Sequence, residues 1–141
     1  MRPSKDEVML AVADKLSVRA TCVKNKVGCV LTDFEGRILS TGYNGVPRHS
    51  PHCIEHPCVG ATGARGSDTC QAVHAEINAL LQCSDVNAIH TCYVTDMPCN
   101  SCMKALLNTG CMRIVTWKTL LDEEPAAAVF WRADGREIIR I

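Results

Sequence analysis

Hydrophobic and polar positions change their spacing several times along the chain, and each change marks a predicted element. Short apolar runs between turn residues predict strands at 27–32, 37–43, 90–95, 112–117 and 136–141. Helices are predicted at 6–20, at 99–108, at 125–133 and in the segment that opens near residue 74, where Ile77, Leu80 and Leu81 form an apolar stripe. Ser4 and Glu7 form a capping box before the first helix.

The order of these elements predicts the fold class. The first two strands flank a turn at 33–36 and form a hairpin. A helix separates the last two strands, and such a crossover makes them run parallel. We therefore predict an α/β fold, a three-layer α/β/α sandwich whose mixed sheet has about five strands. With 141 residues, the chain has the length of a single domain.

Composition narrows the possible partners. The chain carries 15 basic and 15 acidic residues without a basic block, which argues against broad binding of nucleic acid through its phosphates. No apolar run approaches the roughly 20 residues of a membrane span. The N-terminus lacks the apolar core of a signal peptide, so we expect a cytoplasmic protein that has no contact with membranes.

The chain has 10 cysteines, which we expect to be reduced thiols and metal ligands in that compartment. Four of them lie in apolar segments and are predicted to be small buried hydrophobes: Cys29, Cys83, Cys92 and Cys111. Others lie in or next to the irregular stretch 44–68, which is long for a loop without a function or a constraint. A second, closed zinc site would offset the entropy of ordering that loop. Unligated thiols are the alternative, and His49, His52 and His56 can be solvated loop residues.

One pair of motifs carries the chemistry. His74 and Glu76 lie two residues apart, and Cys99 and Cys102 follow Pro98. His74 and Glu76 can share a site only at the first turn of a helix, because residues two apart point about 200° apart within one. One imidazole and two thiolates can hold a catalytic zinc and leave its fourth position open. Glu76 then remains as a proton carrier, and this motif pair is the signature of zinc nucleobase deaminases.

Three other readings of these residues are open. Cys99 and Cys102 alone could form a redox dithiol. Glu76 could be the fourth ligand of a closed structural zinc, although such sites usually use only Cys and His. The protein could also be a zinc-stabilised binding module without turnover, in which case Glu76→Ala should weaken metal retention.

The motifs together resemble the deoxycytidylate (dCMP) deaminases of the cytidine deaminase superfamily. The resemblance covers about residues 17–117 and rests on these segments: Lys26-Val27-Gly28-Cys29, Thr41-Gly42-Tyr43-Asn44-Gly45-Val46-Pro47, Cys70, His74-Ala75-Glu76, Tyr93-Val94-Thr95 and Pro98-Cys99-Asn100-Ser101-Cys102. It implies that residues 1–141 form a single zinc-dependent deaminase domain with a cytidine-deaminase-like fold. It also implies hydrolysis of dCMP to dUMP and ammonia, in which Glu76 moves the protons.

The resemblance further implies how the substrate is held. Asn44 would contact the sugar, and the backbone near Ala75 would read the base. A cation is needed for the phosphate, and Lys24, Lys26 and Arg48 are the candidates. The main rivals within the superfamily are a tRNA adenosine deaminase and a free cytidine deaminase. The balanced charge disfavours the first, and activity on dCMP but not on cytidine would exclude the second.

Several further expectations come from the resemblance alone. Members are often homo-hexamers regulated by dCTP and dTTP, with Mg²⁺ accompanying a nucleotide effector. Some carry a second zinc, and the matching residues here are Cys22, Cys53, Cys58 and Cys70. The chain departs from its relatives after Asn44, at Cys29 and in the C-terminal part, which leaves the phosphate and effector contacts open. The compartment would be the host cytoplasm if the gene is viral.

Overall fold

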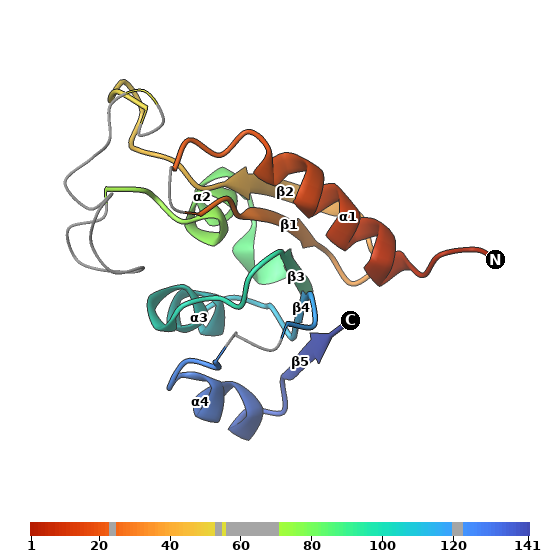
Figure 1. Cartoon of the computed structure of the whole chain (residues 1–141). Helices are drawn as coiled ribbons and strands as arrows, with labels where there is room; N and C mark the ends of the chain where they lie inside the picture. The colour runs from red at the N-terminus through yellow and green to blue at the C-terminus, as the bar shows by residue number, and fades with distance from the viewer. Residues whose placement is uncertain (23–24, 53–54, 56–70, 120–122) are drawn as a thin grey trace.

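A computed structural model describes residues 1–22, 25–52, 55, 71–119 and 123–141 of the chain (Figure 1). Its elements follow one another as α1 Lys5–Ser17, β1 Gly28–Thr32, β2 Ile38–Tyr43, α2 Ala75–Gln82, the 3₁₀ helix η1 Val86–Ala88, β3 Thr91–Val94, α3 Asn100–Leu107, β4 Arg113–Thr116, α4 Ala128–Ala133 and β5 Glu137–Arg140. The strands form a five-stranded sheet in the order β2-β1-β3-β4-β5.

The sheet is mixed, as the element order predicts. Strand β1 pairs antiparallel with both β2 and β3, whereas β3, β4 and β5 run parallel. The prediction that the last two strands run parallel is therefore confirmed. Since parallel strands end at the same edge of a sheet, the loops after β3 and β4 both leave from that edge.

Side chains alternate between the two faces of the sheet and so divide the core into two parts. Val30, Tyr93 and Val115 face α1 and pack with Leu10 and Ala13 of that helix. The strand positions on either side of these residues face α2, α3 and α4, where the larger cluster includes Cys29, Leu31, Cys92, Val94, Ile114 and Trp131. Figure 1 shows α1 on one side of the sheet and the other three helices on the opposite side, which confirms the three layers.

The predicted elements all occur, with shifts at their ends. Helix α1 begins at Lys5, one residue before the predicted start, and the predicted cap is confirmed, because the Ser4 hydroxyl accepts the N–H of Glu7 at 3.1 Å. It ends at Ser17 rather than Ala20, since residues 18–20 donate to carbonyls three residues back and form tightened turns. Helix α4 starts at Ala128 rather than at residue 125, and η1 was not predicted.

The predicted apolar stripe of α2 was wrong in part. Leu81 is 75% exposed, and the fully buried apolar positions of the helix are Ala75 and Ala79. These small residues face Gly42 of β2, where an added Cβ would lie 2.3 Å from the Ala75 carbonyl oxygen. The backbone of α2 thus approaches the sheet at a glycine, and large side chains would not fit between them.

Three of the four cysteines predicted to be buried hydrophobes are fully buried. They are Cys29, Cys92 and Cys111, while Cys83 is half-buried. The Sγ atoms of Cys29 and Cys92 lie 3.7 Å apart across β1 and β3.

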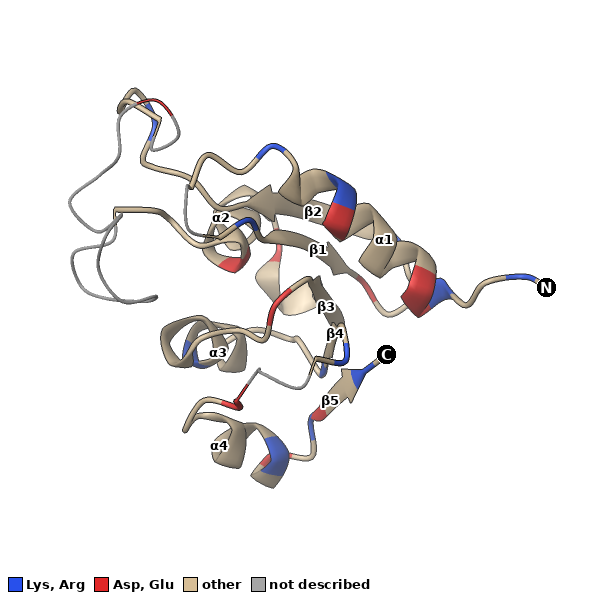
Figure 2. Cartoon of the chain, in the orientation of Figure 1, with Lys and Arg blue, Asp and Glu red and all other residues tan. Residues whose placement is uncertain are grey.

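Charged residues are distributed over many elements. Figure 2 shows lysines and arginines on helices, strands and loops of the described chain, interspersed with acidic residues. None of the helices formed by described residues combines the length and the apolar character of a membrane span.

Candidate metal centre and active site

The site lies where the N-termini of α2 and α3 approach the end of β3. His74 is the N-cap of α2 and Cys99 is the N-cap of α3, and both have extended backbone angles. Cys102 lies in the first turn of α3, and Glu76 lies in the first turn of α2. His74 and Glu76 can therefore share a site although they are two residues apart, because His74 lies outside the regular helix.

His74, Cys99 and Cys102 form a group that could hold a metal ion, with all three ligand atoms within 4.8 Å of one another. His74 Nδ1 lies 3.3 Å from Cys102 Sγ and 3.4 Å from Cys99 Sγ. Zinc bonds of about 2.3 Å to sulfur and 2.0–2.1 Å to nitrogen, at tetrahedral angles, separate two such ligands by about 3.5 Å. The donor types and their spacing therefore both fit zinc.

The thiols of Cys99 and Cys102 are strongly polarised by their neighbours. Hydrogen bonds from the Cys102 thiol and the His74 ring lower the pKa of Cys99 to about 3. Donation to Cys99 and burial raise the pKa of Cys102. Bound zinc would make both groups thiolates, since thiolates are the form that ligates metals.

Glu76 is buried beside these ligands, with only 4% of its surface exposed. Burial raises the pKa of its carboxyl group to about 7, and the His74 ring partly opposes this effect. A carboxyl group whose pKa lies near neutrality can both accept and donate a proton at physiological pH. This environment fits a proton carrier next to the metal centre.

Two contacts that the sequence did not reveal hold His74 in place. Val73 forms an isolated antiparallel bridge with Gly45, with N···O distances of 3.1 and 2.7 Å. Asn78, one turn into α2, donates from Nδ2 to the Tyr43 carbonyl at 2.8 Å. The end of β2 therefore fixes the segment that enters α2. Residue spacing carries no signal for these contacts, because they join distant segments.

Asn44 is buried and its amide binds the backbone of the segment before β1. Its Oδ1 accepts the Val27 N–H at 2.7 Å, and its Nδ2 donates to the Asn25 carbonyl at 2.8 Å. Asn25 in turn donates to Asp96 at 3.0 Å, just before Pro98. Asn44 is not in the left-handed region of backbone angles, since His49 is the residue other than glycine with a positive φ in the described chain.

The remaining predicted site residues are only partly described. Ala75 is fully buried at the start of α2, and Lys26 and Arg48 are exposed. Cys22 is a buried free thiol. The other three predicted ligands of a second zinc, Cys53, Cys58 and Cys70, lie outside the described residues, as does Lys24.

Known proteins match most of this chain. A profile of the cytidine and deoxycytidylate deaminase zinc-binding region matches residues 3–118. The chain belongs to this family. The resemblance inferred from the motifs is thus confirmed.

Two curated relatives named deoxycytidylate deaminase are of different lengths. The one from Saccharomyces cerevisiae is 36% identical over 129 residues, which are 88% of this chain and 41% of that protein. The one from Mycobacterium phage D29 is 38% identical over 122 residues, which are 81% of this chain and 94% of that protein. The chain therefore spans less than half of the yeast protein and nearly all of the phage protein.

A solved structure confirms the fold. The dCMP deaminase of cyanophage S-TIM5, in complex with dCMP and dUMP, superposes with a TM-score of 0.73 over 100% of this chain and 99% of that one. The two sequences are 22% identical, so this likeness concerns the fold.

Proposed function

We propose that this protein is a zinc-dependent deaminase that converts dCMP to dUMP and releases ammonia. The observation that carries the proposal is the convergence of His74, Cys99 and Cys102 beside the buried carboxyl group of Glu76. Membership of the family and the names of its near-full-length phage relative and of the yeast relative support dCMP as the substrate. We also propose that residues 1–141 act as a single domain.

In this proposal His74, Cys99 and Cys102 hold the zinc. Bound zinc supplies an acidified water molecule as the nucleophile at C4 of cytosine. Glu76 would take a proton from the attacking water and deliver it to N3 of the base. It would then take the second proton from the hydroxyl group now bound to C4 and pass it to the amino group, so that ammonia leaves and the C4 carbonyl of dUMP forms. One carboxyl group can perform each transfer, because burial raises its pKa from the ordinary value toward neutrality.

The remaining parts of the site bind and orient the substrate. The proposed base-reading backbone at Ala75 belongs to the first turn of α2, where backbone N–H groups lack partners within the helix. We propose that Asn44 contacts the sugar from the segment that it fixes, and that Lys24, Lys26 or Arg48 neutralises the phosphate. Lys26 follows Asn25, so the Asn25–Asp96 hydrogen bond would also anchor its backbone near the site.

The first test measures ammonia release from dCMP, deoxycytidine and cytidine side by side, on protein whose zinc has been counted. We expect turnover of dCMP alone. Glu76→Gln should keep the zinc and the fold, while kcat falls by at least about 100-fold because proton transfer is lost. Wild-type rates in Glu76→Gln would refute the role of this residue. Loss of zinc from Glu76→Ala, without turnover in the wild type, would favour the binding module.

Assembly, regulation and location are separate proposals. By analogy with the family we propose a homo-hexamer, dCTP and dTTP as effectors with Mg²⁺, and a second zinc on Cys22, Cys53, Cys58 and Cys70. Sedimentation, activity with each effector and a count of about two zinc ions per chain test these proposals. We also propose a cytoplasmic location, because free thiols persist in a reducing compartment.

A further inference from the structure

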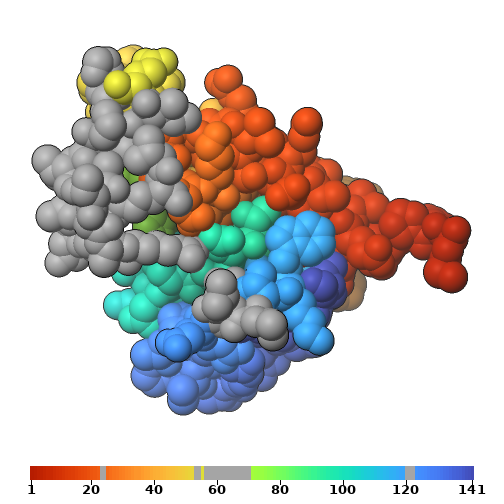
Figure 3. All heavy atoms as spheres, in the orientation of Figure 1, coloured from red at the N-terminus to blue at the C-terminus, as the bar shows by residue number. Residues whose placement is uncertain are grey.

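The C-terminal segment 123–141 contacts both ends of α3, the helix that carries the two cysteines of the metal centre. At the N-terminal end, Asn100 lies between Cys99 and Cys102, and its Oδ1 accepts the N–H of Ala127 at 2.8 Å. At the other end, Arg136 binds carbonyl groups of the last turn of α3 and of the loop that follows it. Figure 3 shows the blue C-terminal atoms directly against the teal region that contains α3.

The Arg136 side chain contacts four backbone carbonyl oxygens at this end of α3. Its Nη atoms donate to the carbonyl oxygens of four residues, at 3.3 Å, 2.9 Å, 3.3 Å and 2.7 Å for Leu106, Leu107, Thr109 and Cys111 respectively. The last carbonyls of an α-helix lack partners within the helix, and a cation is favoured at that end. One guanidinium group therefore joins the last two carbonyls of α3, at Leu106 and Leu107, to two carbonyls of the loop that follows the helix, in addition to the bonds that Thr109 makes to the Leu106 carbonyl.

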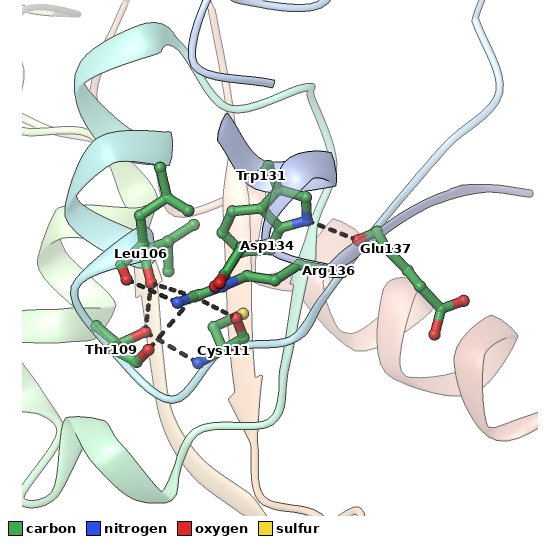
Figure 4. A network of polar contacts seen from close by, with 8 residues as sticks. Leu106, Thr109, Cys111, Trp131, Asp134, Arg136 and Glu137 are labelled. Atoms are coloured by element: carbon green, nitrogen blue, oxygen red, sulfur yellow. Dashed lines mark hydrogen bonds and ion pairs between the residues drawn. The ribbon is translucent and has the colours of Figure 1, made fainter. Parts of the chain in front are cut away.

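The guanidinium group is itself held in one orientation. Its Nε donates to Asp134 at 2.7 Å, and its carbon lies 5.2 Å from the centre of the Trp131 ring. Trp131 is fully buried and its Nε1 donates to the Glu137 carbonyl at 2.9 Å, so the ring is fixed as well. Figure 4 shows Arg136 reaching from the start of β5 to the loop that closes α3. Only 11% of the Arg136 side chain is exposed.

We propose that Arg136 is a positioning residue for the metal centre, which acts by fixing the position of α3 along its axis. Helix α3 has 8 residues and is about 12 Å long, so it moves as a rigid rod. A displacement at its C-terminal end therefore moves Cys99 and Cys102 relative to His74, which is held separately by β2. This inference rests on the proposed zinc site, and it extends the site to the C-terminal segment.

The test compares Arg136→Met with Arg113→Met. Arg113 is a matched control, because its Nη2 also forms a half-buried ion pair, with Asp6 at 2.8 Å, and it contacts α1 and β3 rather than α3. Three quantities are measured: the rate of zinc release to a chelator, the thiolate–cobalt absorption of Co²⁺-substituted protein, and kcat/KM for dCMP. The first two do not depend on the identity of the substrate.

We expect Arg136→Met to release zinc about 10- to 100-fold faster and to shift the cobalt spectrum, since loss of an outer support of metal ligands has effects of this size. Arg113→Met should lose comparable stability and keep both properties. Arg136→Lys should be intermediate, because an ammonium group cannot bind four carbonyls at once. If Arg136→Met does not fold, Arg136→Lys serves as the test variant in its place.

Wild-type zinc release and an unchanged cobalt spectrum in folded Arg136→Met or Arg136→Lys would overturn the proposal. Equal changes in Arg113→Met would overturn it too, because the effect would then follow stability alone. Failure of the wild type to deaminate dCMP would contradict the proposed function, and the two metal measurements would still test the role of Arg136.

Discussion

Gly42→Ala tests whether the distance between α2 and the sheet controls the chemistry. The added Cβ would lie 2.3 Å from the carbonyl oxygen of Ala75 and 2.6 Å from the backbone nitrogen of Ala79. Ordinary contacts of a Cβ begin near 3.4 Å, so α2 must move away from β2 by about 1 Å. Both atoms belong to the backbone, and no side chain can rotate to make room.

This displacement reaches the metal centre directly, because α2 begins at Ala75 between His74 and Glu76. A misplacement of about 1 Å can cost about 100-fold in rate, and we expect a fall of this order in kcat/KM for dCMP. Overpacking should also lower the free energy of unfolding by about 1–3 kcal/mol. Steady-state kinetics and denaturant titration measure the two effects on the same protein.

Gly36→Ala is the matched control. Gly36 has φ +88 in the turn between β1 and β2, and an added Cβ would make only ordinary contacts with Lys5. The substitution should cost about 1–2 kcal/mol of backbone strain and leave α2 in place. Near-wild-type kcat/KM in Gly42→Ala, or an equal loss of activity in Gly36→Ala, would refute the reasoning.

Three further predictions concern other parts of the molecule. Asp6→Asn should lower the free energy of unfolding at neutral pH by about 1–3 kcal/mol. Burial alone would raise the pKa of the Asp6 carboxyl group, but hydrogen bonds from Arg113 and Tyr93 outweigh this effect and lower the pKa. The stabilisation is therefore present above the unfolded pKa of about 4 and is lost as the pH falls through the lower folded pKa. Asn44→Ala should cost about 1–3 kcal/mol, because the buried N–H of Val27 loses its acceptor, and should raise KM if the proposed sugar contact exists. Removal of zinc by a chelator should abolish ammonia release and open the thiols to alkylation, and added zinc should reverse both effects.

Each of these predictions has an outcome that contradicts it. A stability difference between Asp6→Asn and wild type that persists at low pH would show that the ion pair is not its source. Wild-type stability of Asn44→Ala would mean that water replaces the amide without cost. Full activity in protein whose zinc content has been measured as zero would exclude metal-assisted hydrolysis.

The spacing of residues along the chain determined the candidate metal ligands and most of the elements. His74, Glu76, Cys99 and Cys102 could be selected because the chemistry of zinc restricts both residue types and local spacing. The strands and helices followed from apolar periodicity, and the helix between β4 and β5 determined their parallel pairing. These are local properties, and short stretches of sequence encode them directly.

The tertiary structure decided which distant segments meet. The prediction that Asn44 contacts the sugar came from the resemblance, whereas only the structure shows that its amide binds the backbone at Val27. Because the backbone of α2 lies against Gly42, the inner face of α2 has room for alanines and not for leucines. Arg136 reaches the end of α3 only because β5 lies next to β4 in the sheet. Such contacts depend on strand order and on how closely the layers pack, and no periodicity within a single element records either property.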